Sequence, residues 1–180
     1  SDNDVLNKLD EMSFHTSRII KISNMLTKAD IVLLSKASDV DLKEYIKEYL
    51  FNFENSIHII YGNEYTGFIM KLIPVLDLSI VLDNLVSNSK KAGATEITIE
   101  FYDNNNNIEV LFSDNGCGVD LNRFTPESIF DLGVTDRRGG SGIGLSTIRK
   151  RMENDLNGEI EFVGNGIKYT NGATIKLKFY

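Results

Sequence analysis

Cysteine, clustered positive charge and long apolar runs are scarce in this 180-residue sequence. Its single cysteine, Cys117, excludes an intramolecular disulfide and favours a reducing, cytoplasmic setting. No stretch approaches the roughly 18 consecutive apolar residues of a membrane span, and we expect no signal segment, so any membrane anchor would belong to a larger parent protein. The net charge of −7 argues against a nucleic-acid surface, because phosphate backbones require clustered Lys and Arg.

The composition, 42% hydrophobic and 25% charged, is typical of a soluble globular domain, and the length allows one domain with a short appendage. Apolar spacing predicts helices over 12–36, from a cap at Asp39 or Asp41 to Phe53, over 74–91 and over 145–156. Alternating runs predict strands over 56–61, 65–72, 96–102, 108–112, 159–163 and 174–180. Taken two at a time in this order, the strands are predicted to form hairpins, the first around Gly62 and Asn63. Helices on one face of a mixed, largely antiparallel sheet give an α+β fold, a two-layer α/β sandwich.

The helix predicted over 74–91 has two distinct faces. An apolar stripe of leucines forms one face, whereas Asn84, Asn88 and Lys91 share another. Amide oxygens can bind a hard cation, and an ammonium group can bind phosphate oxygens. A solvated polar face explains the same pattern when this helix is considered alone.

The segment 114–118 directly follows a predicted strand. Asp114 can accept a hydrogen bond from an exocyclic amine, and Gly116 and Gly118 can let a flat ring approach the backbone. A plain Asx turn explains these residues equally well. Cys117 has no recognisable neighbouring base and is interpreted as a small filler.

A third segment, 139–145, is rich in glycine and opens directly into a predicted helix. Glycines free main-chain N–H groups to face an anion, and the helix dipole adds positive potential. A dinucleotide loop also uses such glycines, but it requires a preceding strand and a parallel β-α-β unit, which this sequence does not predict. A phosphate-binding loop is therefore the better interpretation.

These three segments occur in the order of one known family. The chain resembles the GHKL superfamily of histidine kinases, gyrases, heat-shock chaperones and mismatch-repair ATPases, which share the Bergerat fold. Three segments of the chain resemble the motifs of this family. They are Asp83–Asn88 for the N box, Asp114–Gly118 for the first glycine box and Gly140–Leu145 for the second glycine box. The resemblance spans 39–180, and the helical segment 1–38 resembles part of a dimerisation hairpin.

The resemblance implies roles for individual residues. Asn88 would bind Mg²⁺, Asp114 would hold the adenine amine, and Phe130 would lie in the aromatic box of a mobile lid. Further implied nucleotide contacts are Asn84, Lys91, Gly116, Gly118, Gly140, Gly142, Gly144, Leu145 and Thr174. Catalytic charge would come from Lys91 and from Arg137 or Arg138, in a segment similar to the lid motif Thr-Thr-Lys of the family.

Asn84 distinguishes between members of this family. The ATP hydrolases of the family have a Glu four residues before the metal-binding Asn, and this Glu activates water. An amide cannot take up a proton at neutral pH, and histidine kinases similarly carry Asn at this place. The segment 92–95 is similar to mismatch-repair ATPases, but Lys91 stands where those enzymes have an acid. The resemblance therefore implies the ATP-binding catalytic domain of a sensor histidine kinase, which transfers the γ-phosphate to a protein histidine.

The implied ligands and partners are ATP or ADP, Mg²⁺, a histidine-bearing dimerisation domain, a response regulator and a homodimeric parent, with no nucleic acid. No acceptor histidine is recognised here, because His15 is followed by Thr16 instead of an acid. Two alternatives stay open. One is a nucleotide-gated interaction module with little turnover, and the other is a mismatch-repair-like ATPase with steady hydrolysis.

Overall fold

The computed structural model describes residues 36–180, apart from 64, 105–106 and 135–141. Its elements run in the order β1 (Ala37–Asp41), α3 (Leu42–Phe51), β2 (His58–Tyr61), β3 (Met70–Pro74), α4 (Val75–Lys91), β4 (Glu96–Asp103), β5 (Ile108–Asp114), η1 (Ser128–Phe130), α5 (Gly144–Asn154), β6 (Gly158–Asn165) and β7 (Ala173–Phe179). The helix predicted over 12–36 lies outside the described residues. None of the helices in the described part is long and apolar enough to cross a membrane.

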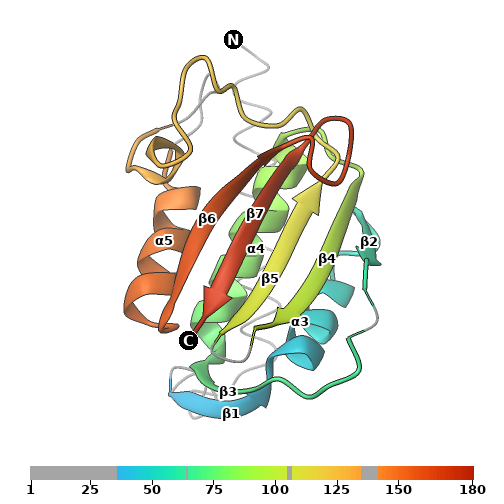
Figure 1. Cartoon of the computed structure of the whole chain (residues 1–180), viewed down its shortest axis with the longest axis vertical. Helices are drawn as coiled ribbons and strands as arrows, with labels where there is room; N and C mark the ends of the chain where they lie inside the picture. Colours follow the sequence, from blue (N-terminus) through green and yellow to red (C-terminus); the bar gives the residue numbers. More distant parts are fainter. Residues whose placement is uncertain (1–35, 64, 105–106, 135–141) are drawn as a thin grey trace.

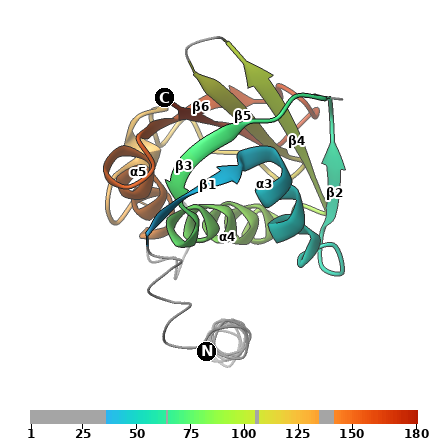
Figure 2. The ribbon, with the colours of Figure 1, turned by 90° about the horizontal axis from the view of Figure 1, so that it is seen from below.

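Five strands form the main sheet, in the order β2-β4-β5-β7-β6 (Figure 1). β2 runs parallel to β4, and the other neighbouring strands are antiparallel. α4 and α5 cover one face of this sheet with α3 beside α4, and β1 and β3 form a separate two-stranded sheet (Figure 2). The predicted two-layer α/β sandwich is confirmed.

Helix α4 forms the centre of the core. Leu78, Leu82 and Leu85 are at most 2% exposed, as expected for its apolar stripe, and they join one hydrophobic cluster with the inward side chains of β4, β5 and β7. Removing these side chains from water is the main favourable contribution to the fold. Pro74 precedes the helix in extended conformation, where its missing N–H breaks no helical hydrogen bond.

Helix α3 begins after the second of its two predicted caps. Asp41 Oδ1 accepts hydrogen bonds from the N–H groups of Lys43 (3.1 Å) and Glu44 (3.4 Å). These bonds satisfy donors that the first turn of a helix leaves without an internal partner. Asp39 lies instead within β1, opposite Leu72 of β3.

The hairpin predicted around Gly62 and Asn63 is wrong. β2 pairs with β4, while β3 pairs with β1, a strand that the sequence did not predict. The Gly62 N–H donates to Ile99 O (2.9 Å) and extends the β2–β4 ladder past the expected turn. The Asn63 side chain then accepts from the Phe101 N–H (3.0 Å) and donates to the Phe101 carbonyl (2.6 Å). These contacts hold the Gly-Asn pair against β4, so the pair does not form a two-residue turn.

The other two predicted hairpins are confirmed. β4 and β5 pair from Ile97 opposite Asp114 to Asp103 opposite Ile108, and β6 pairs with β7 through a bulge near Gly164. Asp114 therefore ends β5 at the same end of the sheet as the start of α5, whereas the β4–β5 turn lies at the opposite end (Figure 1).

Candidate functional site

The polar face of α4 meets the N-terminus of α5. Gly144 is the first residue of α5, and a Cβ atom there would lie 3.3 Å from Asn88 Oδ1 and 3.4 Å from Asn84 Oδ1. Asn84 Nδ2 donates to Ile80 O in its own helix (2.7 Å), whereas Asn88 Nδ2 is buried and has no hydrogen-bond partner among the described residues. Buried amide groups are normally hydrogen-bonded, so Asn88 Nδ2 is placed to donate to an external acceptor, while its Oδ1 lies toward Gly144. The structure thus brings the N box and the second glycine box together.

Asp114 is held in place from three directions. It is only 8% exposed, and its Oδ2 accepts a hydrogen bond from the Ser89 hydroxyl (2.8 Å). Its Oδ1 accepts from the N–H groups of Gly116 (2.9 Å) and Ala173 (3.3 Å). A carboxylate has about four acceptor positions, so these three bonds leave room for a donor from a ligand. A helix, a turn and a strand together orient this acceptor.

Ser89 is a site residue that the sequence analysis missed. It is 2% exposed and continues the apolar stripe of α4 four residues after Leu85. A hydroxyl at a buried stripe position needs a hydrogen-bond partner, and that requirement was the signal available in the sequence. Because Ser89 follows Asn88 directly, adjacent residues of one helix connect the Asp114 region with the start of α5.

The turn after Asp114 packs against the C-terminal end of α4. The Cys117 N–H donates to Ala92 O (3.0 Å), and Asn115 Oδ1 accepts from the N–H groups of Thr95 (2.9 Å) and Glu96 (3.0 Å). Gly116 is buried in this packing, and Gly118 leads out of it. The first glycine box is therefore a closed turn whose carboxylate faces α4.

Three further predicted site residues, Phe130, Gly142 and Leu145, lie at or near the start of α5. Phe130 is 3% exposed in η1, and the Arg149 guanidinium lies 4.9 Å from the centre of its ring. The Gly133 N–H donates to Gly142 O (3.1 Å), which joins the described segments on either side of 135–141. Leu145 is partly buried against the core.

The remaining predicted site residues are a buried threonine, an exposed lysine and three residues that the structure does not describe. Thr174 is 1% exposed on β7, and its hydroxyl forms a hydrogen bond with that of Ser113 (2.9 Å), the residue opposite it on β5. Its hydroxyl is therefore engaged within the sheet, one residue from Asp114. Lys91 is exposed at the last position of α4. Arg137, Arg138 and Gly140 lie outside the described residues.

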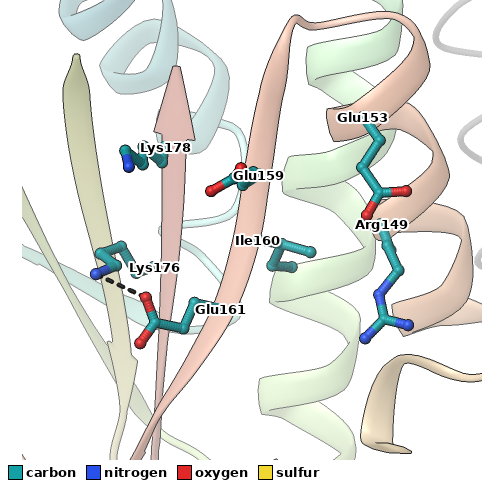
Figure 3. A pocket seen from close by; sticks show the side chains of 7 residues that line it. All are labelled: Arg149, Glu153, Glu159, Ile160, Glu161, Lys176 and Lys178. Atoms are coloured by element: carbon teal, nitrogen blue, oxygen red, sulfur yellow. Dashed lines mark ion pairs between the residues drawn. The ribbon is translucent and has the colours of Figure 1, made fainter. Parts of the chain in front are cut away.

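A separate cleft lies beside α5, β6 and β7 (Figure 3). Its lining residues are Arg149, Glu153, Glu159, Ile160, Glu161, Lys176 and Lys178. Lys176 Nζ pairs with Glu161 Oε2 at 2.7 Å, and this hydrogen bond raises the pKa of Lys176. None of the predicted nucleotide-binding residues lines this cleft. We therefore place the functional site where α4, α5 and the end of β5 meet.

Comparison with known proteins identifies the family. The sequence profile of the histidine kinase-, DNA gyrase B- and HSP90-like ATPases matches residues 75–180. The catalytic domain of the histidine kinase ThkA is 25% identical, with a TM-score of 0.65 over 80% of this chain and 95% of that domain. No curated protein sequence matches the chain significantly. The chain belongs to the histidine kinase-, DNA gyrase B- and HSP90-like ATPase family.

Two further solved structures are similar. ShkA in complex with AMPPNP is 18% identical, with a TM-score of 0.63 over 79% of this chain and 30% of that protein. ThkA in complex with the response regulator protein TrrA is 21% identical, with a TM-score of 0.64 over 96% of this chain and 50% of that chain. The family match and the similarity to the catalytic domain of ThkA confirm the prediction of an ATP-binding domain of the histidine kinase type.

Proposed function

We propose that this chain binds ATP with Mg²⁺ and transfers the γ-phosphate to a protein histidine in two-component signalling. The observation that carries the proposal is that Asn88 faces the start of α5 while the next residue, Ser89, holds Asp114. One helix thereby positions both the amide expected to bind metal and the carboxylate expected to bind adenine. The complex of ShkA with AMPPNP adds support for the nucleotide.

Recognition and charge come from residues of the chain itself. Asp114 accepts a hydrogen bond from the adenine amine. The phosphates lie at the N-terminus of α5, where the first N–H groups of the helix and the positive end of its dipole attract negative charge. The Asn88 amide oxygen would hold Mg²⁺, which takes few protein ligands beside phosphates and water and would neutralise phosphate charge. Lys91 and Arg137 add positive charge near the transferred group.

Asn84 supports transfer to a protein over hydrolysis. Its Nδ2 is bound to Ile80 O, and its Oδ1 is the atom closer to Gly144. An amide oxygen at this position can orient a water molecule but cannot accept a proton from it. An acceptor histidine brings its own nucleophilic nitrogen, so transfer to it does not require a base at position 84.

We propose that this chain contributes two parts to a parent protein. We assign 1–38 to a helical segment of a dimerisation and phosphotransfer hairpin, and 39–180 to the ATP-binding domain. β1 begins at Ala37 and pairs with β3, so the transition between the two parts falls close to this strand. The complex of ThkA with TrrA supports a response regulator as a partner, and a histidine-bearing domain in a homodimeric parent completes the assembly.

Phosphotransfer is expected when the chain is incubated with ATP labelled at the γ-phosphate, Mg²⁺ and the histidine-bearing hairpin of the parent protein. The hairpin should become labelled while little free phosphate appears, because position 84 lacks a base. Both products are measured in the same reaction. Steady phosphate release without a labelled hairpin would support the mismatch-repair-like ATPase instead, and nucleotide binding with neither product would support the interaction module.

The substitution Asn88→Ala is expected to abolish the tightening of ADP binding by Mg²⁺. The ratio of the ADP dissociation constants without and with Mg²⁺ should fall to about one, because coupling between two ligands disappears with their shared interaction. Calorimetric titrations give both constants. Asn104→Ala is the matched control, since Asn104 is exposed in the β4–β5 turn at the other end of the sheet. An unchanged ratio in Asn88→Ala would show that Asn88 is not the metal ligand.

A further inference from the structure

We propose that Asn165 is a positioning residue of the nucleotide site, an inference that rests on the proposed nucleotide binding. Asn165 is the last residue of β6, and it follows Asp114 by about 50 residues in sequence. Its side chain fixes the backbone just after the first glycine box. Through this contact it sets the position from which the lid leaves the adenine-binding turn.

The contact of Asn165 is bidentate and involves both main-chain groups of one residue. Asn165 Oδ1 accepts a hydrogen bond from the Val119 N–H (2.9 Å), and Asn165 Nδ2 donates to the Val119 carbonyl (2.7 Å). The amide thus imitates one rung of a β-ladder between segments 46 residues apart in sequence. Two bonds to one peptide unit restrict both its position and its orientation.

Gly118 allows this contact to form. Its φ is +73°, and a Cβ atom at this position would lie 2.6 Å from Asn165 Oδ1. A side chain at position 118 would therefore be strained and would displace the Asn165 amide. The second glycine of the first glycine box is required here by a protein contact, in addition to any contact with a nucleotide.

The connection that follows Asn165 braces the same turn from its other end. The Gly166 N–H donates to Gly172 O (3.0 Å), which closes the connection between β6 and β7 into a compact loop. At the end of this loop, the Asp114 carbonyl occupies the space where a Cβ of Gly172 would lie, and the Ala173 N–H donates to Asp114 Oδ1 (3.3 Å). The segment from Asp114 to Val119 is therefore held at both ends by the β6–β7 loop and the two residues that flank it, Asn165 and Ala173.

Loss of the Asn165 contact should act on binding more than on folding. Asn165 is exposed, so its removal leaves no cavity in the core. Freed from its two bonds, the backbone at Val119 gains conformations that nucleotide binding must then restrict, and this ordering lowers affinity. Asn88, the proposed Mg²⁺ ligand, lies on α4, whereas the two hydrogen bonds of the Asn165 side chain go to Val119.

The test compares Asn165→Ala with Asn63→Ala in the whole chain. Asn63 is a matched control because its amide forms the same pair of bonds with the backbone of Phe101, on a part of β4 away from Asp114. Asn165→Ala should weaken ADP binding about 3- to 10-fold, the factor expected for lost neutral hydrogen bonds. The factor should be the same with and without Mg²⁺. Asn63→Ala should change ADP affinity less than about twofold, since distant sites act independently.

Calorimetry with ADP and thermal unfolding of all three proteins separate the outcomes. A positioning role also predicts faster amide exchange at Val119 in Asn165→Ala, with no such change in Asn63→Ala. If the parent binds ADP and the two variants bind it equally, Asn165 has no positioning role, while the nucleotide site stands. If the parent binds no ADP under any Mg²⁺ concentration, both the positioning role and the proposed function are wrong.

Discussion

Replacing Asp114 with Asn is expected to weaken ADP binding about 10- to 100-fold, corresponding to about 1.5–3 kcal/mol for a lost hydrogen bond to a charged group. The N–H groups of Gly116 and Ala173 would retain an oxygen at the position of Oδ1. The amide nitrogen would then replace Oδ2, so a donor instead of an acceptor would face the adenine amine and the Ser89 hydroxyl. Calorimetric titration with ADP measures the change.

Ser89→Ala is the matched control for this substitution. It removes the hydroxyl that orients Asp114 but keeps the carboxylate, so we expect a loss of affinity of only about 2- to 10-fold. Thermal unfolding of both variants checks that the buried cluster still folds. An ADP affinity of Asp114→Asn equal to that of the parent would remove Asp114 from the adenine site.

The substitution Asn84→Glu is expected to raise ATP hydrolysis about tenfold or more above the parent. General-base assistance contributes about 100-fold or more in prepared sites, and a grafted base should give less. The new carboxylate would lie on the face of α4 that meets Gly144, where the positive end of the α5 dipole stabilises a negative charge. Phosphate release at saturating ATP measures the effect, after a binding assay has shown that the variant still binds ATP.

Asn84→Gln provides the control, because it has the length of Glu but no basic group. Its hydrolysis should stay at the parental level. Labelling of the histidine-bearing hairpin should fall in Asn84→Glu, since water then competes for the phosphoryl group. Equal hydrolysis by the Glu and Gln variants would contradict the role of position 84, and rapid parental hydrolysis without hairpin labelling would contradict the kinase proposal.

Local patterns predicted the elements whose interactions are short in range. The apolar stripe of α4 and the β4–β5 and β6–β7 hairpins depend on residues close together in sequence, and all three are confirmed. The β2–β4 and β1–β3 pairs join distant segments, and no local signal distinguishes them from a hairpin at Gly62 and Asn63. The structure has the long-range β2–β4 pair instead of a local hairpin, and Asn63 contributes to that pair by bonding to Phe101, 38 residues away.

The candidate site was predictable motif by motif, but its internal contacts were not. Asn88 and Gly144 were expected to act together only through the family resemblance, and the structure places them side by side. Ser89 and Asn165 escaped prediction because their partners, Asp114 and Val119, lie 25 and 46 residues away. The roles of individual residues toward the nucleotide and the metal stay predictions, which the substitutions above test.

The two confirmed hairpins differ in how much alteration their turns can tolerate. Turns between strands are where insertions, labels and new chain ends are usually accepted. The residues that flank the β6–β7 loop, however, bond to Asp114 and Val119, so lengthening the loop would disturb the adenine-binding turn. The β4–β5 turn lies at the far end of the sheet. A fluorescent reporter or an affinity tag therefore belongs in the β4–β5 turn, and natural variation in loop length should concentrate there as well.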